Sequence, residues 1–273
     1  MASGRGDVRI VKHGARSVVA RAFATSPLRL LTPRNDGRAA WVFTSSFGGG
    51  LVDGDRLSLD VNVGDGAAAF LSTQASTKVY RSPNGTSAQM RAQVGRTGLL
   101  VSVPDPVVCF ADSRFDQHQT FDLASDAALV AVDWVSSGRR ESGERCTFAH
   151  YCSRLVVRVD GRLMIHDALA LRREDGDLTA RLGRFDVLAV AVVIGGVVGA
   201  AGRELVRECE GRAVERRPEQ LVVASAVENG RSGDVGCVLR IAGRSVEAVG
   251  RTLRSCLSFV PQELGDDPWA RKW

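Results

Sequence analysis

The sequence has little of what marks a secreted or zinc-stabilised protein. Its 273 residues contain six cysteines, which form no Cys-x-x-Cys pair and are too sparse for a small disulfide scaffold. Four histidines form no His-x-x-His or His-Glu-x-x-His pair, so their spacing indicates no tight zinc site. The longest apolar run, residues 187–202, is broken by glycines and falls short of the roughly 18 residues of a membrane-spanning helix. These absences predict free thiols in the reducing cytoplasm and no membrane partner.

Motifs for nucleotide binding and nucleophilic catalysis are also missing. The glycine-rich segment 47–53 lacks the Gly-Lys-Ser/Thr of a P-loop, and Asp53 stands where Gly-x-Gly-x-x-Gly needs its last glycine. Neither a Gly-x-Ser-x-Gly elbow nor a cysteine-protease signature occurs. The glycines Gly48, Gly49 and Gly50 instead suit a tight turn where two backbone segments approach closely. A catalytic triad assembled from distant positions stays open.

The charge is basic, but it does not indicate nucleic-acid binding. The formal net charge is +5, and the basic residues are spread along the chain with only two tyrosines among them. All but three of the 36 basic residues are arginines. The planar fork of arginine suits ion pairs and protein interfaces better than lysine does, although a GC-rich coding sequence gives the same bias. We therefore expect protein partners and no nucleic acid.

Most of the sequence alternates apolar and polar residues with a period of two, which predicts a mainly β protein. The strand Arg56–Val63, the turn Gly64-Asp65-Gly66 and the returning residues 67–73 predict a hairpin. A second hairpin is expected where Asp160-Gly161 joins residues 155–159 to 163–165. Further strands are expected over residues 127–134, 185–194 and 235–241.

Helices are scarce in this pattern, and about two are expected near the C-terminus. The better one begins at Ser245, which is suited to cap free N–H groups, with Glu247 in its first turn. The other is expected to follow Pro218 and to end at residues 229–230. We find no internal repeat of fixed period and no linker, so residues 1–273 are expected to form a single domain.

Several carboxylates flank predicted strands, where their side chains could point inward. They are Asp55, Asp60, Glu144 and Asp167. On general grounds each is a solvated or ion-paired surface group, Asp55 in the turn after Gly54 and Glu144 paired with Arg139 or Arg140. Each histidine is likewise expected to be satisfied structurally unless a neighbouring group orients it toward a metal.

One set of motifs goes beyond these general patterns. It consists of Gly48-Gly49-Gly50-Leu51-Val52, Gly54-Asp55-Arg56-Leu57, Thr73-Gln74-Ala75-Ser76-Thr77-Lys78-Val79-Tyr80-Arg81, Trp134-Val135-Ser136-Ser137-Gly138-Arg139, Glu141-Ser142-Gly143-Glu144, and Asp167. In these motifs the chain resembles the UreD family of urease accessory proteins, called UreH in some bacteria, and the segment 133–144 resembles the plant form more than the bacterial one. Cys146 departs from the pattern, which has a tryptophan shortly after the Gly-Glu pair. The resemblance covers nearly the whole chain.

The resemblance implies a urease maturation factor and not an enzyme. It implies a helical arrangement of β-sheets, β-helix-like, with about two α-helices near the C-terminus. The partners it implies are the urease apoprotein, UreF and, through UreF, the GTPase UreG. It implies no tightly bound cofactor, with nickel only in transit toward urease. A partner-binding scaffold without metal transit and an unrelated β-rich hydrolase are the alternatives.

The resemblance also directs attention to particular side chains. A conduit should bind nickel weakly through oxygen ligands, because thiolates or clustered imidazoles would hold the ion too long. This favours Asp55, Asp60, Glu144 and Asp167 for a transient nickel path, with His118 as a fifth candidate. The residues expected to maintain the structure or bind partners are Gly48, Gly49, Gly50, Thr73, Gln74, Lys78, Tyr80, Arg81, Trp134, Gly138 and Arg139. Alternation along one strand would place Thr73 and Gln74 on opposite faces.

Overall fold

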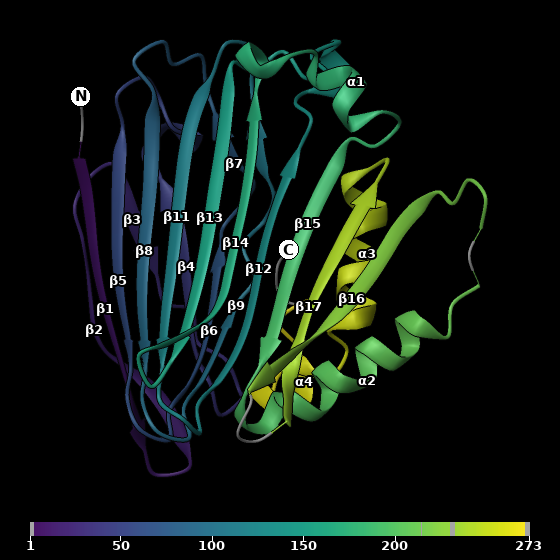
Figure 1. Cartoon of the computed structure of the whole chain (residues 1–273). Helices are drawn as coiled ribbons and strands as arrows, with labels where there is room; N and C mark the ends of the chain where they lie inside the picture. Colours follow the sequence, from purple (N-terminus) through teal and green to yellow (C-terminus); the bar gives the residue numbers. More distant parts are fainter. Residues whose placement is uncertain (1–2, 214, 230–232, 271–273) are drawn as a thin grey trace.

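Two large β-sheets face each other in the structure, a computed structural model that describes residues 3–213, 215–229 and 233–270 (Figure 1). The seven-stranded sheet has the order β14 (Arg162–Arg172), β13 (His150–Val159), β11 (Arg114–Leu123), β8 (Thr86–Val94), β5 (Arg56–Val63), β1 (Ser3–His13) and β2 (Arg16–Ala24). The main path of the ten-stranded sheet is β16 (Gln220–Asn229), β17 (Gly233–Gly243), β15 (Val187–Ile194), β12 (Ala128–Ser136), β9 (Leu99–Ser102), β6 (Ala68–Thr73), β4 (Ala40–Ser46) and β3 (Leu28–Leu31). The short strands β10 (Val107–Cys109) and β7 (Thr77–Val79) extend it from β12.

Between β4 and β13 the chain passes repeatedly from one sheet to the other, so this part winds as a helix of β-strands. Within each sheet the wound strands are parallel, as in the ladders β5–β8–β11–β13 and β4–β6–β9–β12. The predicted mainly β fold with a helical arrangement of sheets is confirmed. The coils repeat at nearly constant length: Arg96 N–H donates to Asp65 31 residues earlier, and Thr97 N–H donates to Asp126 29 residues later. Sequence reasoning missed this repeat because the equivalent turns share few residue types.

The prediction of a hairpin over residues 56–73 is wrong. Strand β5 pairs with β1 and β8, whereas β6 belongs to the other sheet and pairs with β4 and β9. The turn between them is a corner whose hydrogen bonds go to the neighbouring coil: Gly66 N–H donates to the Arg96 carbonyl at 2.8 Å. The second predicted hairpin is confirmed, since β13 and β14 are antiparallel and joined by Asp160 and Gly161, both with positive φ.

One predicted helix is confirmed and the other is wrong. Helix α3 (Val246–Cys256) begins as expected, with the Ser245 hydroxyl accepting from Ala248 N–H at 3.2 Å. Residues after Pro218 form strand β16 instead, which pairs antiparallel with β17. The side chains of residues 220–224 alternate between partly buried and exposed, which is the pattern of a strand and not of a helix. The second long helix is α2 (Gly199–Glu210), which begins at the end of the glycine-broken apolar run. Gly202 permits it to lie close to β17, since a Cβ there would meet Gly236 Cα at 3.0 Å.

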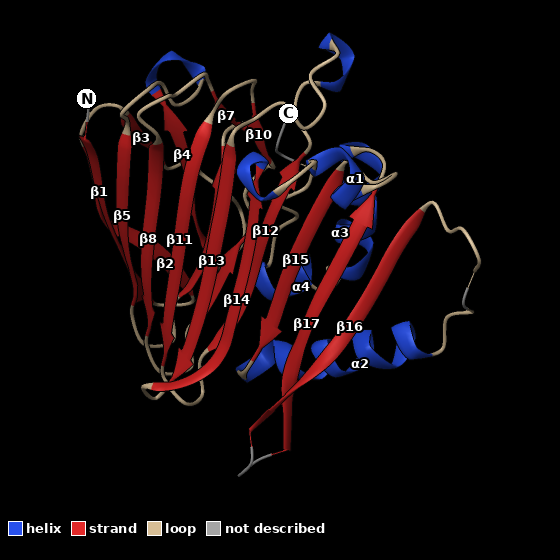
Figure 2. Cartoon of the chain, turned by 45° about the horizontal axis from the view of Figure 1, so that its top comes forward, coloured by secondary structure: helices blue, strands red, loops and turns tan. Residues whose placement is uncertain are grey.

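The core consists of two main layers. One lies between the sheets and contains buried side chains of both, such as Val61, Phe121 and Leu129. The other lies between the ten-stranded sheet and the helices α2, α3 and α4 (Val260–Leu264), where Leu205 and Leu253 pack. Figure 2 shows these helices against one face of β15, β17 and β16. The short α1 (Leu178–Leu182) lies beyond the upper end of β15 in Figure 1. In the part of the chain that is described, no helix combines the length and apolar character needed to cross a membrane.

Candidate functional site

A cavity of about 140 Å³ lies between the two sheets and is lined by strands of both. Its walls are mostly apolar, but polar side chains enter it from several coils. They include Thr73, Asp105, Gln117 and Asp133. Because most side chains between packed sheets are apolar, a group of oxygen-bearing side chains in this layer marks it as a candidate site.

Asp133 is the central acid of this cavity. It is the single charged residue of strand β12, a strand whose remaining residues are apolar apart from its terminal serine. Its carboxylate accepts hydrogen bonds from Gln117 Nε2 at 2.8 Å and from the Ser153 hydroxyl. Burial raises the pKa of Asp133, and the hydrogen bonds from Ser153 and Gln117 oppose that rise. The Asp133 carboxyl therefore gives up its proton at a higher pH than an ordinary aspartate does.

Thr73 and Asp105 form a second polar group on the cavity wall. Asp105 N–H donates to Thr73 Oγ1 at 2.8 Å, and the Thr73 hydroxyl donates to the Asp105 carboxylate at 3.3 Å. Trp134 lies beside them, and its Nε1 donates to the Pro104 carbonyl at 2.8 Å. Thr73 and Trp134, both singled out by sequence, are therefore at the cavity, where they fix the loop that carries Asp105.

Asp167 faces the interior from β14, the last strand of the seven-stranded sheet. Its carboxylate forms an ion pair with Arg240 of β17, in the other sheet. Asp167 is close enough to Asp133 that its negative charge adds to the effect of burial in raising the pKa of Asp133. Of the carboxylates predicted from sequence, Asp167 is thus the one placed beside the central acid.

The other predicted carboxylates do not gather at this cavity. Asp55 is buried in a turn, where its side chain accepts from Val52 N–H at 2.9 Å and its own N–H donates to the Val52 carbonyl at 3.0 Å. Asp60 is exposed on β5, on the face opposite to the buried Leu59 and Val61. His118 is among the residues that line the cavity, but it is exposed on β11, and its pKa is lowered by partial burial and by nearby arginines, Arg154 first among them.

Glu144 pairs with Arg139 above the ends of the strands. The two side chains form a bidentate ion pair, with Arg139 Nε donating to Glu144 Oε2 at 3.0 Å, and this hydrogen bond lowers the pKa of Glu144. The Arg139 guanidinium lies 4.2 Å from the Phe110 ring centroid. Gly138, with φ +122°, is needed here because a Cβ would lie 2.3 Å from the Glu144 carbonyl oxygen. Cys146, the departure from the family pattern, is buried in the same loop.

The segment 73–81 is not one alternating strand, contrary to the prediction. It bends over residues 74–76 between β6 and β7, and Gln74 and Lys78 are both exposed. Tyr80 turns back and packs edge to face on Phe110, with ring centroids 5.1 Å apart. Arg81 is exposed.

The glycine turn is confirmed as a point of close approach. Gly48 and Gly49 have positive φ, and a Cβ at Gly50 would lie 2.6 Å from the Tyr80 ring and 2.7 Å from the Lys78 carbonyl oxygen. Leu51 N–H donates to that same carbonyl at 2.8 Å, which bridges the turn to β7. The two sequence motifs around Gly50 and Lys78 therefore form one structural unit.

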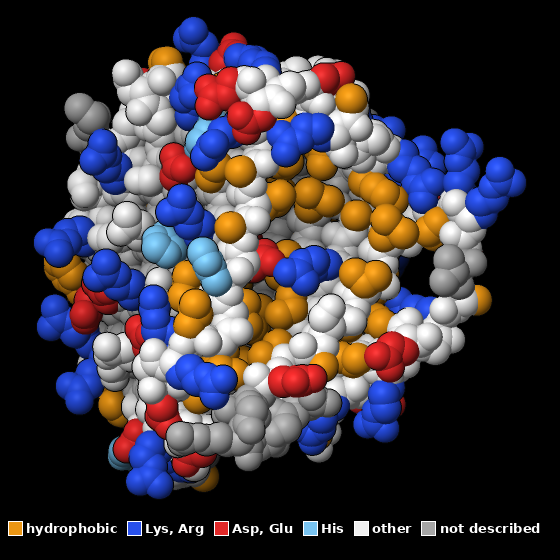
Figure 3. All heavy atoms as spheres, viewed as in Figure 1, with side chains coloured by type: hydrophobic (Ala, Val, Ile, Leu, Met, Phe, Trp, Pro, Cys, Tyr) orange, Lys and Arg blue, Asp and Glu red, His pale blue; other side chains and the backbone are white. Residues whose placement is uncertain are grey.

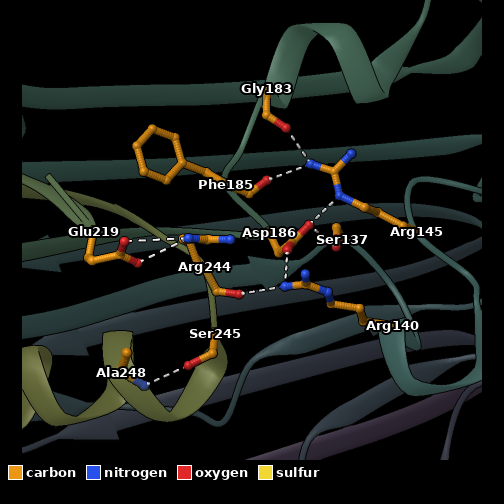
Figure 4. Close-up of polar contacts among 10 residues, drawn as sticks. All are labelled: Ser137, Arg140, Arg145, Gly183, Phe185, Asp186, Glu219, Arg244, Ser245 and Ala248. Carbon is orange, nitrogen blue, oxygen red and sulfur yellow. Dashed lines mark hydrogen bonds and ion pairs between the residues drawn. The ribbon is translucent and has the colours of Figure 1, made fainter. Parts of the chain in front are cut away.

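Asp186 is a buried anchor that sequence reasoning did not single out (Figure 4). It accepts from Arg140 Nη1 at 2.7 Å, from Arg145 Nε at 2.5 Å and from the Ser137 hydroxyl at 3.0 Å. Arg145 also donates to the carbonyl of Gly183 at 2.6 Å. The three arginines in residues 139–145 could have indicated it, because arginines that pack against a protein are usually paired with a carboxylate. This cluster holds the loop of Glu144 to the start of β15.

An apolar hollow lies where the ten-stranded sheet extends beyond β14. Figure 3 shows hydrophobic side chains gathered over β15, β17 and β16 on this face, with charged groups among them. Leu221 and Val223 of the outermost strand are 46% and 55% exposed. Exposed apolar area of this kind, on a concave face with a charged pair, is typical of a protein interaction surface.

The sequence matches the family model described as UreD urease accessory protein over residues 2–273. A protein named urease accessory protein UreD from Sorangium cellulosum (strain So ce56) is 49% identical over 271 residues, which cover 99% of this chain and 85% of that protein. Proteins named urease accessory protein D from Oryza sativa subsp. japonica and Arabidopsis thaliana are 34% and 31% identical, covering 98% and 97% of this chain and 95% and 99% of theirs. With the family model matching nearly every residue, the chain belongs to the UreD family of urease accessory proteins.

Proposed function

We propose that this protein is a non-catalytic, cytoplasmic scaffold of urease maturation that binds the urease apoprotein and UreF, and through UreF the GTPase UreG, while nickel passes between its two sheets. Membership of the UreD family supports the role in urease maturation. The observation that carries the passage is the set of oxygen ligands between the sheets, with Asp133 at its centre.

The chemistry of the cavity suits transit better than storage. Carboxylate, hydroxyl and amide oxygens accept a divalent ion and exchange readily, whereas thiolates and imidazoles hold first-row metals more tightly. The raised pKa of Asp133 lowers its affinity further, because a proton competes with the ion. Asp105 and Thr73 offer further oxygen atoms on the same cavity wall.

The partner surface of this proposal is the apolar hollow. Leu221 and Val223 leave large apolar side chains exposed beside the Asp167–Arg240 pair. A partner that covers this face would bury apolar area and enclose the charged pair, which gives both affinity and orientation.

The test is nickel loading of urease in a reconstituted complex with UreF and UreG. Asp133→Asn keeps the shape of the side chain and removes its charge, and we expect it to lower nickel per urease while complex formation stays intact. Asp60→Asn is the matched control, because Asp60 is exposed on the outer face, and it should load nickel like the wild type. Wild-type loading by Asp133→Asn would contradict the passage.

A second candidate function, a scaffold without metal transit, is favoured by one contact. Asp167 is engaged by Arg240, and a guanidinium beside the acids repels an incoming cation. In that case the protein would only open urease and recruit the GTPase. The same experiment separates the two, since Asp133→Asn would then lose neither the complex nor the nickel.

A further inference from the structure

Three metal-binding residue types meet on the outer face of the seven-stranded sheet, away from the cavity between the sheets. They are Asp116 of β11 and His150 and Cys152 of β13. Their side chains point outward, because the alternate residues Phe115 and Tyr151 are buried inside. None of these three residues lines the cavity between the sheets.

The register of two parallel strands creates the cluster. Asp116 lies directly beside Cys152 in the β11–β13 ladder, and His150 precedes Cys152 by two residues on the same face. One potential ligand atom from each residue lies within 4.8 Å of the others, and His150 Nε2 is 3.0 Å from Asp116 Oδ1. Ligands held tetrahedrally at about 2.0–2.3 Å from a zinc ion are roughly 3.3–3.8 Å apart. Side-chain rotations that move the ligand atoms by about 1 Å therefore suffice to bring all three within bonding distance of one ion.

We propose that Asp116, His150 and Cys152 form a three-ligand site for a borderline divalent transition-metal ion, of which Zn²⁺ is the representative. A thiolate and an imidazole select such ions over Mg²⁺ and Ca²⁺, which prefer oxygen ligands alone. One carboxylate, one thiolate and one neutral imidazole carry two negative charges, which neutralise a divalent cation. On binding, the Cys152 thiol forms the sulfur–metal bond and releases its proton to solvent.

The surroundings leave room for a fourth ligand. A depression of about 200 Å³ is lined by Asp116 and Cys152 together with Gln89 of the neighbouring strand. Three protein ligands and an open position are typical of a zinc site that exchanges water or a partner's side chain. The His150 side chain is only 15% exposed, whereas Asp116 is 67% exposed, so the ion would bind at the edge of the buried imidazole.

Two arginines oppose the site: Arg154 lines the same depression, and Arg172 of β14 is in direct contact with a ligand. The contact of Arg172 is the stronger obstacle. The Arg172 guanidinium hydrogen-bonds to Cys152, and this contact raises the pKa of Arg172. A guanidinium in contact with a ligand repels an incoming cation, so the Arg172 side chain must turn away when a metal ion binds. Replacing it should therefore strengthen binding of the metal, which distinguishes a metal site from a purely structural thiol–arginine contact.

The proposal does not depend on nickel transit, because the two sites lie on opposite faces of the seven-stranded sheet. It is tested on the full chain with Co²⁺ as a spectroscopic probe and Zn²⁺ as its competitor. Wild type should show a sulfur-to-cobalt charge-transfer band at one equivalent, which Zn²⁺ removes and Mg²⁺ does not. Cys152→Ser should abolish the band, and His150→Ala should weaken Co²⁺ binding by more than about tenfold.

Cys209→Ser is the matched control, since Cys209 is also a partly exposed thiol but lies on α2, outside the cluster. It should keep the wild-type band and affinity, and Arg172→Gln should bind Co²⁺ more tightly than wild type. Circular dichroism of each variant confirms that it is folded. Absence of the band in the wild type, or its persistence in folded Cys152→Ser, overturns the proposal.

Discussion

Asp167 of β14 and Arg240 of β17 form an ion pair that joins the two sheets at the edge where the seven-stranded sheet ends. The two residues are 73 positions apart in the sequence, so only the completed coil brings them together. On one side of this pair lies the polar cavity with Asp133, whose pKa Asp167 helps to raise. On the other side lies the apolar hollow, so the pair stands between the proposed metal passage and the proposed partner surface.

The apolar hollow predicts a specific loss of partner binding. Leu221→Asp together with Val223→Asp would place two charges on an apolar face, and burying unpaired charge opposes association. We expect the variant to remain folded, because both side chains are about half exposed, and to recover less UreF or urease in a pull-down. Val18→Asp on β2, also an exposed apolar position, serves as the control and should bind partners normally. Equal recovery of partners by both variants would show that the apolar hollow is not a partner-binding surface.

Replacing Gly138 by alanine should lower the stability of the protein through a steric clash. In Gly138→Ala the new Cβ would lie 2.3 Å from the Glu144 carbonyl oxygen at φ +122°, so the loop must shift. Gly176→Ala has the same φ of +122° but open space, and it controls for backbone strain alone. We expect Gly176→Ala to lower the free energy of unfolding by about 1–2 kcal/mol and Gly138→Ala by clearly more. Urea denaturation measures both, and equal losses would show that the contact with Glu144 is unimportant.

The ion pair of Glu144 with Arg139 should stabilise the protein at neutral pH and stop doing so in acid. The hydrogen bond from Arg139 lowers its pKa in the folded protein below the ordinary value of 4.5. A carboxyl with a depressed folded pKa contributes stability above its unfolded pKa and loses that contribution as the pH falls through the folded pKa. Glu144→Gln should therefore be less stable than wild type at pH 7, and this difference should shrink as the pH drops below 4.5. A difference that does not change with pH would contradict the pairing seen here.

The contribution of Asp133 to the stability of the protein should depend on pH in the opposite direction. Because burial raises its pKa when folded, the folded state holds the proton at a pH where the unfolded state has released it. Wild type should lose stability relative to Asp133→Asn as the pH rises from the unfolded pKa through the folded one. Urea midpoints measured for both proteins across this range give the comparison. A wild type that gains stability relative to the variant as the pH rises would show that Asp133 is held as a charged, well-paired group.

Local patterns were sufficient for some elements of this fold. The β13–β14 hairpin follows from a two-residue turn at Asp160-Gly161, and α3 follows from the cap at Ser245. Both depend on residues close in sequence. The chain from β5 to β6 carries the same kind of turn signal, yet its partners lie about 30 residues away in neighbouring coils, which local alternation does not reveal.

The candidate site was harder to predict for the same reason. Sequence reasoning chose acids beside turns, and two of them, Asp55 and Glu144, proved to satisfy their own loops. Asp133 was passed over inside an apolar strand, although a charge in such a strand must have buried partners. Its partners, Gln117 and Ser153, come from the preceding and following strands of the other sheet, so only the coil geometry assembles them.

The most direct test of a nickel passage through this protein is to fill the cavity between the sheets. Ala88 lines that cavity, and Ala88→Phe would occupy much of its 140 Å³, whereas Ala170→Phe adds the same ring on the exposed face of β14. In the reconstituted complex with UreF, UreG and urease apoprotein, nickel per urease is measured after activation, with complex formation measured in parallel. Ala88→Phe should form the complex but deliver much less nickel, while Ala170→Phe should deliver the wild-type amount. Full nickel loading by an intact Ala88→Phe complex would contradict a passage between the sheets.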